Sequence, residues 1–295
     1  MPIREMVLAA LTSVVWGLAF VATKLALDGF SASQLTALRF IIACLPVLFV
    51  PRPAIAFPSL VLIGLTLFAG QFLLLFFALA AGMPPGLASV SQQLQVFFTV
   101  ILAAIFLRDL PTLRQCVGMA VAFAGLALIA LTVGGDLRPI ALGLALAAAL
   151  SWAVGNVLIK RHASVPIFPL VVWCSLVPPL PALFLSSLYD DRSLVAALAD
   201  ASWLSIAAAI YLGTLTTIFG YAVWGRLLQR HSASVVAPFA LLSPCTAILA
   251  SAAIFGEAFS PLREAGMALI LAGLVVIVVP GHWLAKARPA RRRRV

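Results

Sequence analysis

This sequence has very little charge. Charged side chains make up 9% of its 295 residues, and apolar side chains make up 64%. An ordinary soluble domain has about 25% charged and about 45–50% apolar residues. This composition excludes an ordinary soluble protein and predicts a polytopic membrane protein. The net charge of +10 does not indicate nucleic-acid binding, because most Lys and Arg residues stand at the ends of apolar segments.

Patterns of catalytic and metal-binding residues are also missing. The four cysteines lie inside apolar segments without CxxC spacing, so we interpret them as small core residues. The sequence has no H-E-x-x-H, no Cys/His set and no paired acid, which argues against a membrane enzyme that acts on lipid. It has no P-loop, so it is not by itself an ATP-driven pump. We expect neither enzymatic activity nor a cofactor or metal.

Acidic groups are absent from the middle of the apolar segments. All nine Asp and Glu residues lie at segment ends, in connections or in tails. The three histidines, His162, His231 and His282, lie at the edge that we assign to the cytoplasm. A proton-coupled carrier usually has a carboxylate or a His relay within the membrane. We therefore hypothesise facilitated transport down a gradient, or coupling through an unusual group.

Ten apolar segments are long enough to cross a membrane, which takes about 20 residues. They are Met6–Leu27, Ser33–Val50, Pro58–Ala80, Gly86–Leu107, Leu113–Thr132, Ile140–Ile159, Ile167–Leu188, Ser202–Leu227, Ala233–Phe255 and Leu262–Val279. The first is long and lacks an A-x-A exit, so we expect it to remain as a membrane span. The connections are short, and the longest is about Tyr189–Ala201.

The positions of Lys and Arg predict the orientation. With the N-terminus in the cytoplasm, fourteen of the nineteen basic residues face inside, and Arg138, Arg192 and Arg263 face outside. Cytoplasmic connections carry the excess of Lys and Arg, so both termini are predicted to be cytoplasmic. The Arg-rich tail fits a topology signal that also contacts anionic lipid headgroups.

The sequence repeats itself. A Trp followed eight positions later by a Lys occurs at Trp16 and again 136 residues later at Trp152. A Gly-Met-Ala block at Gly118 recurs 148 residues later at Gly266. Because each half has five segments, an odd number, the second half must enter the membrane from the opposite side. We predict two inverted five-helix repeats, at 1–138 and 139–284, and a basic tail at 285–295.

Aromatic and amide residues mark the candidate substrate wall. Trp16, Phe20 and Lys24 share one helix face, and Trp152, Asn156 and Lys160 repeat it. The two Trp rings fall near mid-span, where they either line a cavity or fill a gap between helices. Lys24 and Lys160 lie near helix ends, where each can reach the interface, and Lys24 could act as an anchor or a gate.

Arg39 lies within the second segment, about six residues from its outer side. An intramembrane charge is costly and calls for a functional hypothesis. We expect a structural ion pair with Asp28, which ends the first segment near the same surface, in preference to substrate binding.

Buried amides need partners, which either a neighbouring helix or a polar substrate can supply. Gln71 lies mid-span in the third segment, and Gln92 and Gln95 lie in the fourth. Ser243 follows Gln95 by 148 residues, so the two are predicted repeat equivalents. The matching helices of the second half offer Thr214, Thr216, Thr217, Tyr221 and Trp224.

Proline and glycine predict two further features. Six prolines lie inside the segments and permit kinks: Pro46, Pro178, Pro179, Pro181, Pro238 and Pro244. The fifth and tenth segments are rich in Ala and Gly, which suits close helix packing, either in the scaffold or in a dimer. The chain is thus expected to be a monomer or a homodimer.

Several motifs in order give the chain a family resemblance. They are Val15-Trp16-Gly17-Leu18 with Lys24, Leu38-Arg39-Phe40, Gly82-Met83-Pro84 with Gly86-Leu87-Ala88-Ser89, Gln95 with Phe97-Phe98-Thr99, Ser151-Trp152 with Gly155-Asn156, and Gly220-Tyr221 with Trp224-Gly225. From about residue 5 to 283 the chain resembles the EamA family of the drug/metabolite transporter superfamily, and within it the O-acetylserine/cysteine exporters. One departure is Arg108-Asp109, where the family often has Gly-Glu.

The resemblance implies a ten-helix carrier of the bacterial inner membrane that exports amino acids or related metabolites through a cavity shared by both halves. The family pattern also favours a cavity position for Gln95. An alternative is an exporter or flippase of apolar drugs or lipids, which predicts a cavity lined almost wholly by aromatic rings. The amides at Gln71, Gln92, Gln95 and Asn156 favour a polar substrate instead.

Overall fold

The computed structural model describes residues 1–83, 90–132, 138–255 and 260–278. Every regular element within these ranges is a helix, which confirms the all-helical class. Some expectations lie outside the described residues: the motif from Pro84 to Ser89, His282 and the basic tail at 285–295.

The elements follow one another as helices joined by short connections. The first half holds α1 (Ile3–Leu27), α2 (Ala32–Cys44), η1 (Leu45–Leu48), α3 (Phe57–Ile63), η2 (Gly64–Gly70), α4 (Gln71–Ala80), α6 (Leu94–Leu107) and α7 (Leu113–Ala130). The second half holds α8 (Pro139–Arg161), α9 (Ile167–Cys174), α10 (Pro179–Tyr189), α11 (Leu194–Asp200), α12 (Trp203–Tyr211), η3 (Leu212–Phe219), α13 (Gly220–Arg230), α14 (Ala233–Val236), η4 (Ala237–Leu241), α15 (Leu242–Phe255) and α16 (Pro261–Val278).

Nine stretches of the described chain are helical, apolar and long enough to cross a membrane. The remaining expected span, Ser33–Val50, corresponds to Ala32–Leu48, a shorter apolar helix. Its last turn is the 3₁₀ segment η1, which begins just before Pro46. Proline has no N–H to continue an α-helix, which explains the change of helix type.

Two other predicted kinks lie at prolines. Pro178 and Pro179 separate α9 from α10, and Pro238 lies in the 3₁₀ segment η4 between α14 and α15. Pro244 instead lies in the first turn of α15, where the helix lacks intrahelical acceptors for its first N–H groups in any case.

Two π-helical segments, which the sequence analysis did not predict, interrupt long helices. They are η2, between α3 and α4, and η3, between α12 and α13. They start at Gly64 and Leu212, which are 148 positions apart, the offset of the Gly-Met-Ala blocks. A π-helix widens the helical turn and leaves carbonyl groups available to neighbouring side chains.

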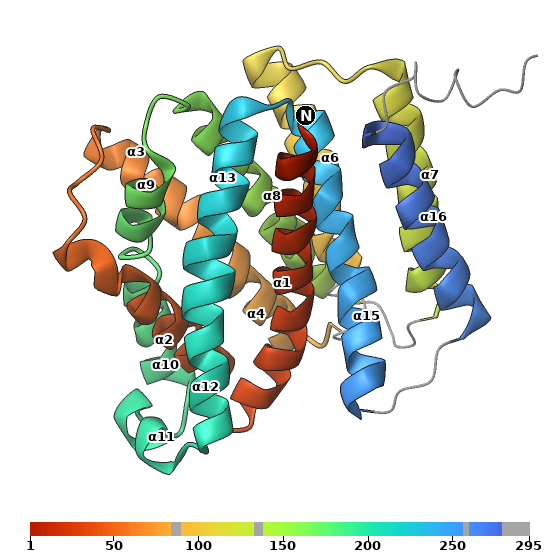
Figure 1. Cartoon of the computed structure of the whole chain (residues 1–295). Coiled ribbons are helices and arrows are strands. Elements are labelled where there is room, and N and C mark those ends of the chain that lie inside the picture. Colours follow the sequence, from red (N-terminus) through yellow and green to blue (C-terminus); the bar gives the residue numbers. More distant parts are fainter. Residues whose placement is uncertain (84–89, 133–137, 256–259, 279–295) are drawn as a thin grey trace, which may run out of the picture.

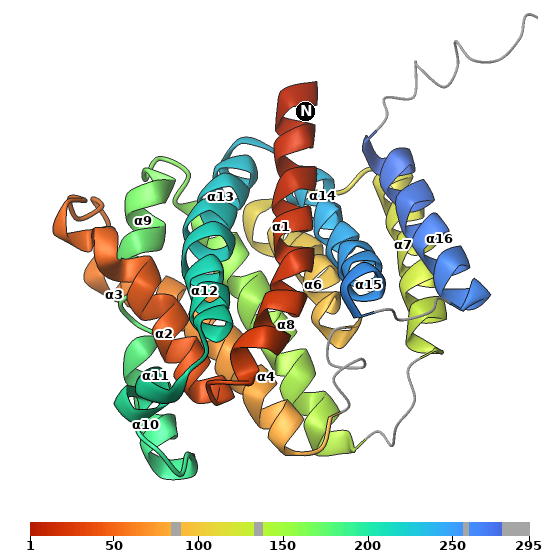
Figure 2. The ribbon, with the colours of Figure 1, turned by 60° about the horizontal axis from the view of Figure 1, so that its bottom comes forward.

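The helices α7 and α16 stand side by side at one edge of the bundle (Figures 1 and 2). Their glycines meet in pairs. A Cβ atom on Gly125 would lie 2.4 Å from the carbonyl oxygen of Gly266, and one on Gly273 would lie 2.5 Å from that of Gly118. The Ala/Gly-rich helices therefore form a scaffold contact within the chain.

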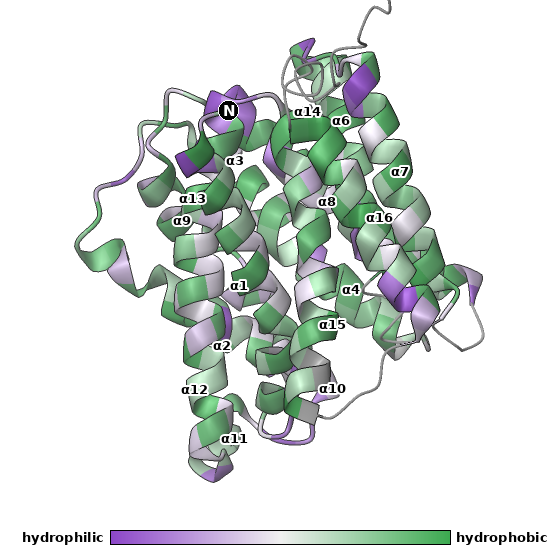
Figure 3. Cartoon of the chain, turned by 45° about the vertical axis from the view of Figure 1, so that its right-hand side comes forward, coloured by the Kyte–Doolittle hydropathy of each residue, from purple (hydrophilic) through white to green (hydrophobic). Residues whose placement is uncertain are grey.

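Helix α1 packs against α12, α13 and α15. In both views α1 lies between α15 and the continuous α12–η3–α13 helix, with α8 behind it (Figures 1 and 2). Hydrophobic residues cover the sides of the bundle, and hydrophilic residues gather mainly at its two ends (Figure 3). Large apolar side chains such as Phe106, 70% exposed, fit a surface that faces lipid.

Replacing Gly125 with Ala is expected to destabilise the chain by about 1–3 kcal/mol, because the new methyl group must push α16 away. Gly143→Ala on α8 is the matched control, since a Cβ atom there meets nothing within 4 Å. Thermal unfolding of the two variants in detergent measures the difference. An equal melting temperature for both would contradict the packing that we describe.

Candidate functional site

Four aromatic rings from both halves of the chain meet in the middle of the bundle. They belong to Trp16 on α1, Trp152 on α8, and Tyr221 and Trp224 on α13, and we call them the aromatic cluster. The Trp16 ring centroid lies 6.1 Å from Trp152, 5.2 Å from Tyr221 and 5.0 Å from Trp224. Because these residues are far apart in sequence, only the folded bundle brings the rings together.

In each half of the chain, the first helix donates a hydrogen bond to the π-helical segment of the other half. The Trp16 indole N–H donates to the carbonyl oxygen of Thr216 in η3, at 3.0 Å. The Ser151 hydroxyl on α8 donates to the carbonyl oxygen of Thr66 in η2, at 2.7 Å. Gly220 permits the first contact, because a Cβ atom there would lie 2.6 Å from the Trp16 nitrogen.

Amide and hydroxyl groups border the aromatic cluster on two sides. The Tyr221 hydroxyl donates to the Gln71 side-chain oxygen at 3.3 Å. The Trp224 indole N–H donates to the Asn156 side-chain oxygen at 3.3 Å, and the Asn156 amide donates to the Thr99 hydroxyl, also at 3.3 Å. Polar groups from α4, α6, α8 and α13 therefore converge on the rings.

Three neighbouring glutamines carry buried amide atoms without a hydrogen-bond partner in the described part of the chain. They are both polar atoms of the Gln92 side chain and the oxygens of Gln93 and Gln95. All three side chains are more than nine-tenths buried. Leaving a buried polar group unpaired costs about 1–3 kcal/mol each. Such groups in a carrier point to a polar substrate or water that completes them.

Arg39 is buried, and its partners differ from the expected one. Its Nε donates to the Thr217 hydroxyl at 2.7 Å, and its Nη2 donates to the Thr216 hydroxyl at 3.0 Å. The expected ion pair with Asp28 is wrong, because none of the ion pairs among the described residues involves Arg39. Asp28 is exposed at the end of α1, whereas Arg39 turns inward toward η3.

Other predicted positions lie apart from the aromatic cluster. Phe20 is 42% exposed, so its ring is on the surface of the bundle. Lys24 is exposed near the end of the same helix. Ser243 is buried where α15 approaches α1, and its carbonyl oxygen would lie 2.7 Å from a Cβ atom on Gly17.

Several residues at the site were not predicted from the sequence. Gln93 escaped notice although it stands between Gln92 and Gln95, and their crowding was the available signal. The rings of Phe68 and Tyr221 lie 4.9 Å apart and extend the aromatic contacts toward α2. Phe72 lies 4.5 Å from the Arg39 guanidinium carbon. No sequence pattern distinguished these phenylalanines from the many that face lipid.

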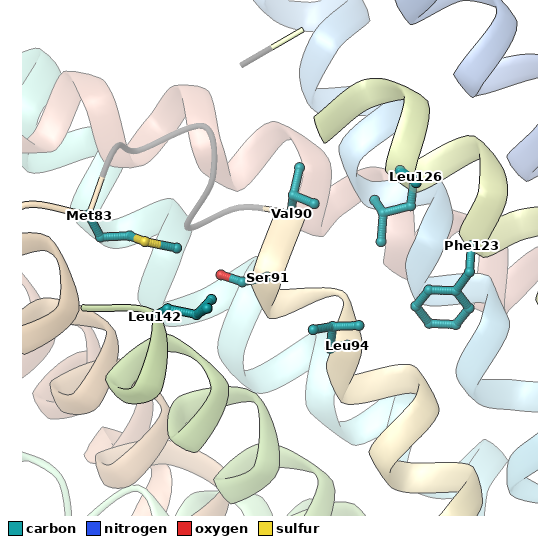
Figure 4. Close-up of a pocket in the computed structure, with 8 residues that line it drawn as sticks. Met83, Val90, Ser91, Leu94, Phe123, Leu126 and Leu142 are labelled. Carbon is teal, nitrogen blue, oxygen red and sulfur yellow. The ribbon is translucent and has the colours of Figure 1, made fainter. Parts of the chain in front are cut away.

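An open pocket of about 260 Å³ lies beside α6, and no residue of the aromatic cluster lines it (Figure 4). Its lining residues are Met83, Val90, Ser91, Leu94, Phe123, Leu126, Ala127 and Leu142. Seven of these eight side chains are apolar, so the pocket suits an apolar group. Among the described residues, no cluster of His, Cys, Asp or Glu could hold a metal ion.

A polar network closes the end of the bundle that holds the N-terminus. The Lys160 ammonium lies 3.1 Å from the Asp109 carboxylate and also donates to the carbonyl oxygens of Leu228 and His231. Asp109 accepts further hydrogen bonds from the Ser232 hydroxyl and the Ala233 N–H. Lys160 thus lies at a helix end, as expected, and bonds there to neighbouring segments.

A second network closes the opposite end of the bundle. The Asp190 carboxylate accepts hydrogen bonds from the hydroxyls of Ser31 and Ser33, each at 2.6 Å. Gln34 donates to the carbonyl oxygen of Arg192 at 2.7 Å. These contacts join the start of α2 to the connection after α10. Both ends of the bundle are therefore held together by polar contacts.

Two matches identify the family. The EamA-like transporter family matches residues 3–131 and again 139–279, so it covers most of the chain. This chain belongs to the EamA-like transporter family. Together with its long apolar helices, this makes it a multi-pass transporter of the bacterial inner membrane and not an enzyme.

Curated relatives are similar over nearly their whole length. A protein of Salmonella typhimurium named "Probable amino-acid metabolite efflux pump" is 39% identical, over 92% of this chain and 93% of that protein. Its Escherichia coli namesake is 37% identical, over 95% and 96%. A "Probable terminal-alkyne amino-acid exporter" of Streptantibioticus cattleyicolor is 30% identical, over 90% and 91%.

A solved crystal structure shares the fold. It superposes with a TM-score of 0.80 at 19% identity, and the match covers 93% of this chain and 98% of that one. At this low identity the likeness concerns the arrangement of helices alone. The helix positions that carry the aromatic cluster thus belong to a fold known from experiment.

The network at the N-terminal end predicts a pH dependence of stability. Burial would raise the pKa of the Asp109 carboxyl, yet its hydrogen bonds and the Lys160 ammonium hold that pKa below the ordinary value. A lowered pKa means that the ionised form stabilises the fold. This contribution is complete above the unfolded pKa of about 3.9 and is lost as the pH falls through the lowered pKa.

Asp109→Asn should therefore lower the stability at pH 7 by about 1 kcal/mol, after allowance for solvent screening. The gap to the wild type should shrink below about pH 4. Thermal unfolding of both proteins across pH measures it, with Asp191→Asn, an exposed acid in the connection after α10, as control. A gap that stays constant down to pH 3 would argue against this role.

Proposed function

We propose that this chain exports amino acids or related small metabolites from the cytoplasm by alternating access around a central cavity. The observation that carries the proposal is the set of unpaired amides at Gln92, Gln93 and Gln95, buried in a membrane protein of a transporter family. Zwitterionic substrates carry both donors and acceptors that such amides can bind. The names of the relatives, which are amino-acid metabolite efflux pumps and an amino-acid exporter, support the same substrate class.

The mechanism that we propose uses two inverted five-helix repeats with both termini in the cytoplasm. Three structural relations favour it: the π-helical segments 148 positions apart, the reciprocal contacts of α1 with η3 and of α8 with η2, and the paired glycines of α7 and α16. In inverted repeats the substrate site lies where the two halves meet. The aromatic cluster takes rings from both halves and occupies that place.

In this mechanism the polar networks at the two ends act as gates. Transport requires the Asp109 network at one end and the Asp190 network at the other to open in turn. Hydrogen bonds between side chains suit this role, because water can replace them when an end opens. We also propose that the basic tail contacts anionic headgroups and that the chain works as a monomer or a homodimer.

The second candidate function is export of apolar drugs or lipids. The pocket beside α6 favours it, because its lining is almost wholly apolar. Against it stands the cost of keeping several unpaired amides and the Arg39 charge within the membrane, which an apolar substrate would not offset. The two candidate functions predict that cells gain resistance to different classes of compound.

Gln95→Leu should abolish the resistance that the chain gives to cells challenged with toxic concentrations of single amino acids. The amide is lost while the volume is nearly kept, so a loss of at least about tenfold follows if Gln95 binds the substrate. Phe97→Leu, on the exposed side of the same helix, is the control and should keep the resistance. If Gln95→Leu protects cells as the wild type does, the second candidate gains.

Transport is expected to run without proton coupling, because no carboxylate of the described residues lies in the middle of a span. Purified protein in liposomes should move a labelled amino acid at nearly equal rates with and without an imposed pH gradient. Rates that rise severalfold with the gradient, and fall when an uncoupler is added, would disprove uncoupled export.

A further inference from the structure

The guanidinium of Arg39 keeps most of its hydrogen-bonding capacity unused. An arginine has five N–H donors in one plane. Two of them bind the hydroxyls of Thr217 and Thr216, and no acceptor in the described chain takes the other three. The residue is only 8% exposed, so bulk solvent does not surround these donors. Two of the unused N–H groups can donate parallel hydrogen bonds to the two oxygens of one anion.

The charge of Arg39 also lacks a counter-ion among the described residues. Aromatic rings surround the guanidinium: Phe72 lies 4.5 Å and Phe40 lies 5.7 Å from its central carbon. None of the ion pairs among the described residues involves Arg39. A buried cation without an anion is costly, and proteins keep such groups for function.

The two threonines fix the guanidinium in place. Both hydroxyls donate to the carbonyl oxygen of Leu212, the first residue of the π-helical segment η3. Each hydroxyl has then given away its only hydrogen and can only accept from Arg39. This arrangement sets the plane of the guanidinium before any ligand arrives. A preorganised charge binds an anion with little loss of conformational entropy.

Arg39 adjoins the aromatic cluster through shared neighbours. The Thr216 hydroxyl accepts a hydrogen bond from Arg39, and the Thr216 carbonyl oxygen accepts one from the Trp16 indole N–H. The Phe40 ring, 5.7 Å from the guanidinium carbon, contacts the Phe68 ring, which in turn contacts the Tyr221 ring of the cluster. The unused donors therefore lie at the border of the candidate site, at the side formed by α2, α4 and η3.

We propose that Arg39 is the carboxylate-binding residue of the transport pathway, and that the carboxylate of the exported amino acid supplies its missing anion. This rests on the proposed function and specifies it, because it makes the α-carboxylate a requirement for recognition. A bidentate pair of guanidinium and carboxylate satisfies the unused donors and neutralises the charge at once. Amines and esters of similar size lack this anion and bind weakly.

Binding to purified protein in detergent tests the proposal without any need for transport. The probes are L-cysteine, L-serine and L-phenylalanine, each compared with its methyl ester, and the readout is the half-saturating concentration for the shift in melting temperature. For at least one pair, the acid should bind the wild type about tenfold more tightly than the ester. In Arg39→Met this preference should vanish, while the affinity for the ester stays within about twofold.

Two further variants separate binding from folding. Arg226→Met removes an exposed arginine of α13 and should keep the preference for the acid. Arg39→Lys keeps the charge without the planar guanidinium group. It should therefore lower the affinity for the acid and leave the affinity for the ester unchanged. If Arg39→Met does not fold, Arg39→Lys decides: equal weakening of acid and ester, or none at all, would mean that Arg39 only pins α2 to η3.

The remaining outcomes distinguish this proposal from the proposed function. If no acid binds the wild type better than its ester, or if Arg39→Met keeps the preference, Arg39 does not bind the carboxylate, and amino-acid export can still stand on the resistance assay. If the preference depends on Arg39 while cells gain no resistance to any amino acid, the carboxylate site stands and the exporter function fails.

Discussion

The structure depends on one constraint: hydrocarbon offers no hydrogen bonds, so polar groups between the helices must find partners within the protein. The π-helical segments η2 and η3 help to meet it. Their freed carbonyl groups accept hydrogen bonds from Ser151 and Trp16, each on the first helix of the opposite half. The carbonyl oxygen of Leu212 accepts hydrogen bonds from Thr216 and Thr217, the two threonines that hold Arg39. The widened turns thus link the halves and place the charged group beside the aromatic cluster.

Groups that the protein leaves unpaired stand out against this background. Within the described residues, the buried side-chain atoms without a hydrogen-bond partner belong to Gln92, Gln93, Gln95 and Trp152. Arg39 uses only two of its five donors. The amide oxygens can accept from an ammonium, and the guanidinium can donate to a carboxylate. The arrangement suits a zwitterion that meets different partners as the halves move, and it does not suit an apolar compound.

Much of the fold could be predicted from the sequence, because apolar length and proline positions are local signals. The repeat of Trp16 at Trp152 pointed to two rings that the structure brings into contact, together with those of Tyr221 and Trp224. Their role in substrate binding stays a prediction. What escaped prediction depends on tertiary contacts. The π-helical segments have no local signature, and helix spacing alone placed Phe20 on the face of Trp16, although its ring points outward. Arg39 was paired with Asp28 by depth, whereas the rotation of α2 decides its partners.

The central claim is that a small zwitterion, and not an apolar compound, crosses the membrane through this bundle. The most direct measurement is the initial rate at which radiolabelled L-cysteine leaves liposomes that contain the purified chain, with ethidium efflux measured in parallel. The account predicts saturable cysteine efflux that unlabelled amino acids inhibit, and no ethidium movement above that of empty liposomes. Ethidium efflux that depends on the protein, without any amino-acid efflux, would contradict it.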